Sequence, residues 1–213
     1  LQKAKIHLEN KIAPIETEQE YMQNDIDKIT VRRLRQVYNR EEIFQKWMTN
    51  EKIRPILKQI LNDTPVLTLA HHNSIMTKLP FESTRTFWHQ DRRYWNFENN
   101  DLVSVWLSLG DEYLDNGLLE FIPKSHKITF EKEQFDEVDN FLDTHPKNIE
   151  LIKTKVHTNL QKGDVVLFHC KTLHHANKNS SPKPKISFVY TVRANSNKPI
   201  TNTRSDFKEV ILD

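Results

Sequence analysis

The stretch Leu102-Val-Ser-Val-Trp-Leu-Ser-Leu109 carries the pattern that decides the fold. Apolar residues alternate with small polar ones along it, and β-branched and aromatic side chains recur, which is typical of a half-buried strand. Working outward, turn signals at Asp115-Asn116-Gly117 and Gly163-Asp164 separate this stretch from its neighbours. Further short strands are predicted at 66–70, 74–79, 118–122, 165–168 and 186–192.

Helices are expected on one side of these strands, within residues 1–62. The clearest is marked by a stripe of apolar residues at 43, 44, 47 and 48, which is the spacing of a core-facing helix. Two more are indicated by the spacing of Ile26, Ile29, Leu34 and Val37, and by Pro55 ahead of Ile56 to Leu61. Short strands with helices at one end predict a mainly β protein with flanking helices, of jelly-roll type.

We expect a single domain over 1–213, in which 1–62 is the helical part and 64–127 with 161–193 form the core. The segment 128–160 is an insertion, because it interrupts the strands with an acidic helical pattern. An insertion of this kind either covers a binding mouth or packs on the outside of the sheet.

Composition narrows the classes of function. Only three glycines occur among 213 residues, which excludes glycine-rich nucleotide loops. A formal net charge of +2 indicates no nucleic-acid partner, and no apolar run approaches the ~20 residues of a membrane span. The single cysteine, Cys170, excludes an internal disulfide and fits a reducing compartment, so a cytoplasmic location is expected. Because the chain starts at Leu1, we expect the natural N-terminus to lie upstream. The sequence does not exclude a cleaved targeting segment there.

Two histidine-containing stretches could do chemistry. His89 and Asp91 are two residues apart, so on a strand both would point to the same face. His174 and His175 follow an apolar strand, 85 residues after His89. Two histidines and one carboxylate on one face of an ion leave three positions open, which suits non-haem Fe(II). A surface salt bridge at His89 and Asp91, and a polar strand end at His174, are the alternatives.

The order of several motifs adds a resemblance. Residues 78–127 contain KLPFESTRTFWHQD, YW, LVSVWLSLG and NGLLEFIPKSHK, and GDVVLFHCKTLHHANKNSSPKPKISFVYTV follows. Over residues 43–193 the chain resembles the phytanoyl-CoA dioxygenase family of Fe(II)/2-oxoglutarate-dependent oxygenases. The resemblance implies a double-stranded β-helix (jelly-roll or cupin-like) core, with Fe(II) as cofactor and 2-oxoglutarate as cosubstrate. It also implies a reaction in which O2 hydroxylates an unactivated C–H bond of a small molecule, with release of succinate and CO2.

The same resemblance assigns a metal site. His89, Asp91 and His174 match the iron ligands and are the expected catalytic residues, with His175 as a neighbour of the ligand. Adjacent strand residues point to opposite faces, so only one of the two histidines can be a ligand. In halogenating relatives a small residue replaces the aspartate, so the presence of Asp91 argues for hydroxylation.

Cosubstrate binding is assigned to Lys185, Lys78 and Trp106. The family places an arginine eleven residues after the distal histidine to clamp the far carboxylate of 2-oxoglutarate, and here that position is Lys185. A lysine keeps the charge but loses the planar bidentate fork. The alternatives are a solvated Lys185, a solvated Lys78 and a Trp106 that belongs to the core. Arg193 lies eight residues further on, roughly 26 Å along a straight strand, which is too far to substitute.

Basic residues are expected near the mouth of the site and favour an anionic substrate, although a solvated rim explains them equally well. They are Arg85, Arg92, Arg93, Lys171 and Arg193. A competing hypothesis is a catalytically silent jelly-roll binding protein that retains the metal site, which the lysine at 185 favours. A zinc hydrolase with the same His-Asp-His set is a third, without support from the resemblance.

Overall fold

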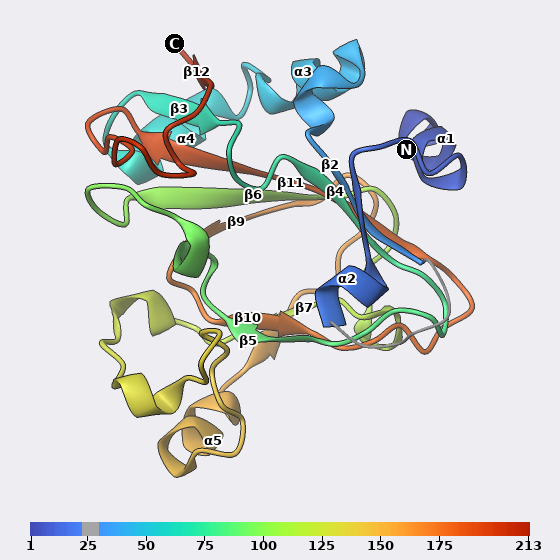
Figure 1. The fold of residues 1–213 in the computed structure, drawn as a ribbon, viewed down its shortest axis with the longest axis vertical. Coiled ribbons are helices and arrows are strands. Elements are labelled where there is room, and N and C mark those ends of the chain that lie inside the picture. Colours follow the sequence, from blue (N-terminus) through green and yellow to red (C-terminus); the bar gives the residue numbers. More distant parts are fainter. Residues whose placement is uncertain (23–29) are drawn as a thin grey trace.

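The chain folds into two facing antiparallel sheets, with helices outside the large sheet and a further helix outside the small one, as the computed structural model of residues 1–22 and 30–213 shows (Figure 1). No helix in these two ranges is both long and apolar enough to cross a membrane. The helices are α1 (Gln2–Glu9), α2 (Glu18–Met22), α3 (Glu42–Met48), α4 (Arg54–Leu61) and α5 (Pro146–Ile152). The strands are β1 (Ile15–Thr17), β2 (Val31–Arg35), β3 (Pro65–Thr68), β4 (Ser74–Lys78), β5 (Thr86–His89), β6 (Leu102–Ser108), β7 (Leu119–Phe121), β8 (Val156–His157), β9 (Val165–His169), β10 (His174–Ala176), β11 (Lys185–Ala194) and β12 (Glu209–Ile211).

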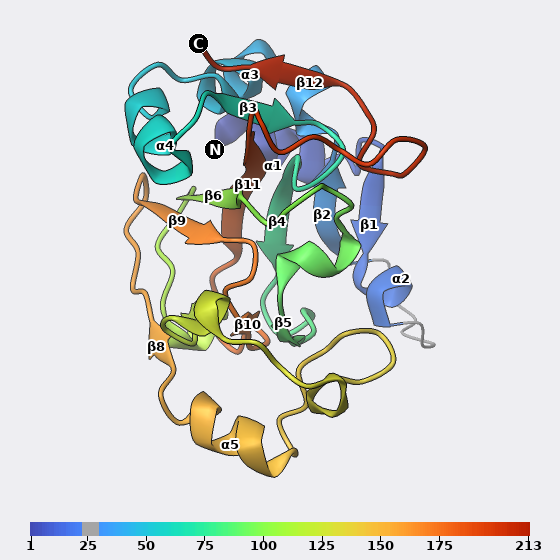
Figure 2. The same cartoon turned by 90° about the vertical axis from the view of Figure 1, so that its left-hand side faces the viewer.

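The large sheet is organised around β11. Its strands run in the order β1-β2-β4-β11-β3-β12, and β6 pairs with the other edge of β11 and with β9. All ten residues of β11 are buried, because helices cover one face and the small sheet faces the other (Figure 2). Phe188 and Tyr190 contact Phe44 and Trp47 of α3, with ring centroids 5.6 Å and 6.1 Å apart. Each such fully buried side chain contributes about 1.5–3 kcal/mol.

The small sheet has the order β5-β10-β7-β8 and lies below the large one in Figure 1. Because side chains alternate along a strand, it has two different faces. Leu119, Phe121 and Ala176 turn inward and pack with Trp106, Phe168 and Val189 of the large sheet. The space between these two inner faces is where the candidate site lies.

The outer face of the small sheet is covered by the insertion 128–160. Trp88, Ile122 and Leu173 form a buried cluster there with Phe141 of the insertion, and Phe130, Phe135, Leu151 and Ile152 pack around it. The body of the insertion therefore lies on the side away from the space between the sheets. Of its residues, Val138 and Asn140 reach the opening of that space.

The predicted core strands are present within a residue or two of the expected bounds, and the jelly-roll arrangement is confirmed. The expectation that 1–62 is helical throughout is wrong, because Ile15–Thr17 and Val31–Arg35 are strands of the large sheet. Leu34 is buried on β2, not on a helix, and Ile26 and Ile29 lie outside the described residues. Arg32 is buried within β2 because Glu18 of α2 pairs with its guanidinium at 3.0 Å.

Candidate metal and cosubstrate site

His89, Asp91 and His174 converge between the two sheets. His174 on β10 lies directly opposite His89 on the neighbouring strand β5, and their ring centroids are 4.3 Å apart. Asp91 Oδ1 lies 3.7 Å from Nε2 of His89 and 3.6 Å from Nε2 of His174. One donor atom from each residue lies within 4.8 Å of the others. This spacing lets one ion reach all three at bond lengths of about 2.0–2.2 Å.

Asp91 joins the other two by a different route from the one predicted. His89 is the last residue of β5, and Asp91 opens the short 3-10 helix Asp91–Tyr94. The alternation of a strand therefore does not place Asp91, and the tight turn after β5 brings its carboxylate back to the ring of His89. The side chains of His89 and Asp91 point into the same space, as predicted. Strand alternation accounts for the direction of His89 only, because Asp91 is not on the strand.

Backbone carbonyls fix both imidazole rings. Nδ1 of His89 hydrogen-bonds to the carbonyl of Phe87 at 2.8 Å, and Nδ1 of His174 to that of Thr172 at 2.9 Å. A carbonyl only accepts, so Nδ1 carries the proton and the Nε2 lone pair faces Asp91. Burial lowers the pKa of His89 to about 3 and also lowers that of His174. Both rings are therefore neutral, as metal ligands must be.

Two residues that the sequence did not reveal hold Asp91. Its Oδ2 accepts a hydrogen bond from Ser104 Oγ of β6 at 2.7 Å, and its Oδ1 lies 2.8 Å from Nε2 of His72. Burial raises the pKa of Asp91, but contacts led by His72, whose Nε2 lies 2.8 Å from Oδ1, outweigh that effect and hold the pKa well below its ordinary value. The carboxylate is therefore ionised. Outer partners of this kind orient ligands in known metal sites.

A cavity of about 70 Å³ extends from these three residues between the sheets. Its walls include the predicted Lys78, Trp106 and Lys185 together with His89, Asp91 and His174. The rest of the lining is mostly apolar, with Met76, Leu119, Phe168 and Val189 among its residues. The structure therefore brings the six residues assigned from the sequence to one cavity.

The two lysines lie at the far end from the His-Asp-His group, and neither is solvated. Lys185 and Lys78 are directly opposite each other on β11 and β4, and each is at most 5% exposed. Lys78 Nζ donates to the carbonyl of Thr84 at 2.7 Å, and Lys185 Nζ lies 3.6 Å from Glu112 Oε2. Burial lowers the pKa of both lysines, well below the ordinary value for Lys78.

Gly117 permits this packing. Its φ of +77° is in the left-handed region, and a Cβ there would lie 2.4 Å from the carbonyl oxygen of Asn177 and 2.7 Å from Cδ of Lys78. Only glycine tolerates both the backbone conformation and the close approach. The Asn116-Gly117 turn, which the sequence indicated as a strand connection, therefore also makes room for the Lys78 stem.

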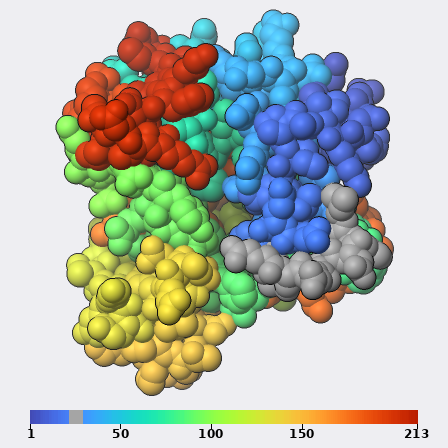
Figure 3. All heavy atoms as spheres, viewed as in Figure 1, coloured from blue at the N-terminus to red at the C-terminus, as the bar shows by residue number. Residues whose placement is uncertain are grey.

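The cavity opens to the surface through a mouth of about 540 Å³. In Figure 3 this face is hollowed between the N-terminal segments in blue and the segment around residues 90–95 in green. Arg93 and Arg204 line the mouth, and neither forms an ion pair with a described residue. Nη1 of Arg93 instead donates to the carbonyl of Val138 at 3.2 Å and to Oδ1 of Asn140 at 2.7 Å.

Two of the basic residues expected at the mouth are used elsewhere. Arg193 is buried at the far end of β11, where its Nε donates to Glu209 Oε1 at 2.7 Å, so its placement at the mouth was wrong. Arg85 pairs with Asp143 of the insertion. Arg204, by contrast, lines the mouth although its sequence context carries no signal.

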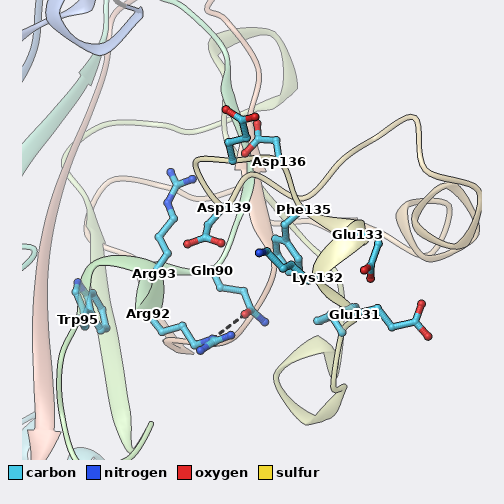
Figure 4. Close-up of a pocket in the computed structure, with 12 residues that line it drawn as sticks. Gln90, Arg92, Arg93, Trp95, Glu131, Lys132, Glu133, Phe135, Asp136 and Asp139 are labelled. Carbon is cyan, nitrogen blue, oxygen red and sulfur yellow. Dashed lines mark hydrogen bonds between the residues drawn. The ribbon is translucent and has the colours of Figure 1, made fainter.

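A second, wider groove of about 1010 Å³ begins beside Arg93. Arg92 and Arg93 stand on one side, and an acidic stretch of the insertion stands on the other (Figure 4). Its acidic residues are Glu131, Glu133, Asp136, Glu137 and Asp139. Because Arg93 lines both the mouth and this groove, the two open next to each other.

Known proteins with similar sequences are dioxygenases. The chain is 29% identical over 191 residues to the ectoine dioxygenase of Halomonas elongata, covering 78% of this chain and 54% of that protein. It is 28% identical over 133 residues to the human peroxisomal phytanoyl-CoA dioxygenase, covering 59% and 39%. The chain spans about half the length of such curated relatives.

Solved structures share the fold. EctD from S. alaskensis with bound Fe has a TM-score of 0.73 at 19% identity, covering 99% of this chain and 72% of that one. The epimerase SnoN in complex with Fe3+, alpha ketoglutarate and nogalamycin RO has a TM-score of 0.74 at 18% identity, covering 93% and 74%. The sequence profile of phytanoyl-CoA dioxygenase (PhyH) matches residues 8–187, most of the chain. The chain therefore belongs to the phytanoyl-CoA dioxygenase family.

Proposed function

We propose that the chain is an Fe(II)/2-oxoglutarate-dependent dioxygenase that hydroxylates an unactivated C–H bond of a small molecule. The balanced reaction takes the substrate, O2 and 2-oxoglutarate to the hydroxylated product, succinate and CO2. The observation that carries the proposal is the convergence of His89, Asp91 and His174 at one end of a buried cavity that has two lysines at the other.

The donor set fits iron. Two neutral imidazole nitrogens and one carboxylate oxygen, all from one side, are the ligands that non-haem Fe(II) oxygenases use. We assign His89, Asp91 and His174 as these ligands, held in place by Phe87, Thr172, Ser104 and His72. When bound, Fe(II) supplies the activation of O2. The protein contributes the orientation of the reactants and the exclusion of water.

The far end of the cavity fits the other end of a dicarboxylate. We assign Lys185 and Lys78 to the distal carboxylate of 2-oxoglutarate, with the Trp106 indole as part of the wall. An ammonium has three donors, so each lysine can hold its present partner and still donate to a carboxylate. The family has a bidentate arginine at the position of Lys185. In this arrangement two lysines supply two point charges in its place.

The substrate is proposed to enter through the mouth and to carry an anionic group. Arg93 and Arg204 support this assignment, because they line the mouth without an acidic partner among the described residues. Tyr94 and Trp95 line the same mouth and offer apolar contact to the rest of the molecule. The loop 136–140 is proposed to close part of the entrance, while a cytoplasmic location stays a prediction.

A silent binding protein is the second candidate, and the Lys185–Glu112 contact favours it. In that case Glu112 would be the permanent partner of the Lys185 ammonium, and the pair would belong to the packing of the sheet. Retention of the metal would then serve binding or structure, and no succinate would form.

One experiment separates the two. The purified protein is loaded with Fe(II) without oxygen, mixed with 2-oxoglutarate and exposed to O2, and succinate is quantified. We expect slow succinate formation without added substrate, lost in Asp91→Ala and unchanged in Asp143→Ala, a surface control. Absence of succinate from protein that binds iron and 2-oxoglutarate would favour the silent binding protein.

A further inference from the structure

Glu112 is a buried carboxylate for which neither the sequence pattern nor the proposed reaction has a use. It follows β6 and its side chain is fully shielded from solvent. Its backbone is clamped by a pair of hydrogen bonds, from Glu112 N to Leu160 O at 2.8 Å and from Leu160 N to Glu112 O at 3.0 Å. A buried carboxylate is costly unless other groups compensate it, so its partners indicate its role.

Those partners belong to the cosubstrate end of the cavity. Oε1 accepts hydrogen bonds from Trp106 Nε1 at 3.0 Å and from Ser187 Oγ at 2.6 Å. Among the residues that the structure describes, Oε2 has no hydrogen-bond partner, and it faces Lys185 Nζ at 3.6 Å. The same ammonium lies 5.1 Å from the centroid of the Trp106 ring. One carboxylate thus holds two of the residues assigned to 2-oxoglutarate.

We propose that Glu112 is the positioning residue of the cosubstrate pocket: it holds the Lys185 ammonium and the Trp106 indole and keeps Lys185 charged for the distal carboxylate of 2-oxoglutarate. This inference rests on the proposed function. The open Oε2 atom and the long contact to Lys185 leave ammonium donors available, so Lys185 can bridge Glu112 and an incoming carboxylate.

Charge balance explains why a carboxylate is needed there. The charged groups around Lys185 of β11 are Lys78 of β4, Arg32 of β2, Glu112 after β6 and Glu18 of α2. Arg32 is paired with Glu18 at 3.0 Å and lies 3.8 Å from Glu16, whereas Glu112 is the carboxylate that faces Lys185. Burial lowers the pKa of Lys185, and the Glu112 carboxylate raises it. Glu112 therefore supports the positive charge of Lys185, the ammonium that is offered to the distal carboxylate.

Glu112→Gln tests the proposal, because the amide still accepts from Trp106 and Ser187 but carries no charge. We expect the variant to bind 2-oxoglutarate about ten- to one-hundred-fold more weakly at pH 8, measured without oxygen by the charge-transfer absorption of the Fe(II) complex. Affinity should recover as the pH falls, whereas the wild type stays nearly flat. Calorimetry in buffers of different ionisation enthalpy should show that the variant takes up about one more proton per 2-oxoglutarate bound than the wild type does.

Two controls keep the outcome clear. The ligand 2-oxopentanoate has the same chain as 2-oxoglutarate without the distal carboxylate, and Glu112→Gln should not change its affinity. The double variant Glu112→Gln, Lys185→Met replaces the ion pair by neutral groups, and its weak 2-oxoglutarate binding should be independent of pH. If Glu112→Gln does not fold, the comparison of this double variant with Lys185→Met carries the test: if Glu112 acts through Lys185, its replacement should cause no further loss of 2-oxoglutarate affinity.

The results against the proposal are distinct. Equal or tighter 2-oxoglutarate binding by Glu112→Gln, without proton uptake, would overturn the proposal. Glu112 would then either stabilise the fold or weaken cosubstrate binding. Equal weakening of 2-oxoglutarate and 2-oxopentanoate would also overturn it, because the effect would not depend on the distal carboxylate. A wild-type protein that binds Fe(II) but no 2-oxoglutarate would instead refute the proposed function.

Discussion

His174 and His175 are neighbours on β10 and point to opposite faces of the small sheet. Nε2 of His174 lies 3.6 Å from Asp91 Oδ1 between the sheets, whereas Nε2 of His175 lies 2.6 Å from Glu120 Oε2 on the outer face. The ring of His175 also packs on Trp88, with centroids 4.1 Å apart. Strand alternation therefore divides one His-His pair into a candidate ligand and a packing residue.

Alanine at each position gives the first prediction. His174→Ala should weaken Fe(II) binding by more than about 100-fold, since a first ligand matters at least as much as its outer partners. His175→Ala should leave Fe(II) binding within a few-fold and lower the free energy of unfolding by about 1–2 kcal/mol. Metal titration and urea unfolding of both variants provide the measurements. Loss of metal in His175→Ala alone would show that the register assigned to the ligand is wrong.

Lys185 and Lys78 give the second prediction. Each charge-assisted hydrogen bond to the distal carboxylate is worth roughly 1.5–3 kcal/mol, so Lys185→Ala should weaken 2-oxoglutarate binding about ten- to one-hundred-fold. Lys185→Arg should retain binding where the cavity has room, and Lys78→Met should act like Lys185→Ala. Dissociation constants measured without oxygen decide this. Unchanged 2-oxoglutarate affinity in both lysine variants would show that other residues bind the distal carboxylate.

The Asp91 partners give the third prediction. Ser104→Ala removes the hydrogen bond to Oδ2 while keeping the backbone of β6, so Fe(II) affinity should fall about tenfold. Ser108→Ala is the matched control, because Ser108 lies on the same strand and its hydroxyl bonds the carbonyl of Gly110 instead. An effect of Ser108→Ala as large as that of Ser104→Ala would point to the strand and not to the carboxylate.

Gly117 gives the fourth prediction. Gly117→Ala should lower the free energy of unfolding by about 2 kcal/mol or more, because a Cβ collides with Asn177 and Lys78 and the backbone has a positive φ. It should also weaken 2-oxoglutarate binding by displacing Lys78. Gly163→Ala is the control for backbone strain, since its φ is +101° and a Cβ there has open space. Equal losses of unfolding free energy in the two variants would show that backbone strain alone explains the effect and that the close contact with Lys78 adds nothing.

His71 gives a pH prediction. Its pKa is lowered to about 3, first by burial and then by Arg204, and its Nε2 lies 2.8 Å from Ser205 Oγ. The folded protein keeps this ring neutral below pH 6.5, whereas the unfolded chain binds a proton there. His71 therefore contributes stability that is present above about pH 6.5 and is lost as the pH falls towards 3.

The measurement is urea unfolding of the wild type and of His71→Gln at pH 5 and pH 7. The wild type should lose about 1–2 kcal/mol more than the variant between these two values, because only the wild type has this proton to bind on unfolding. Parallel losses in the two proteins would show that His71 titrates normally in the folded state.

The core strands could be predicted because their signals are local: alternation marks β6 and β11. The His-Asp-His group was proposed from the order of its motifs and the family resemblance, because no local spacing joins His174 to His89 and Asp91. The strand β2 could not be predicted, since arginines are ordinarily solvated and the burial of Arg32 is made favourable by groups from other elements, among them Glu18 and Thr86. His72, Ser104 and Glu112 were missed for a similar reason: each meets its partner through long-range folding, and no spacing in the chain marks it.

The insertion 128–160 could be recognised from the sequence, but the sequence did not decide whether it covers the binding mouth or packs on the outside of the sheet. Its aromatic residues decide most of the question, because Phe141 packs beside Trp88 on the outer face of the small sheet. Trp88 precedes His89, so the face that it presents is opposite to that of the candidate ligand. Apolar spacing shows that such a segment packs, but not on which side of a sheet.

His89 and His174 donate hydrogen bonds from Nδ1 to the carbonyls of Phe87 and Thr172, and these bonds orient both imidazole rings. We therefore expect folding and metal loading to be separate events, because the two rings are oriented by backbone carbonyls. We expect the identity of the bound cation to depend on which metal ions are available and on how they exchange at the site, not on the folding pathway. Protein prepared in a zinc-rich medium should be fully folded yet inert, and chelation followed by Fe(II) should restore activity without a refolding step.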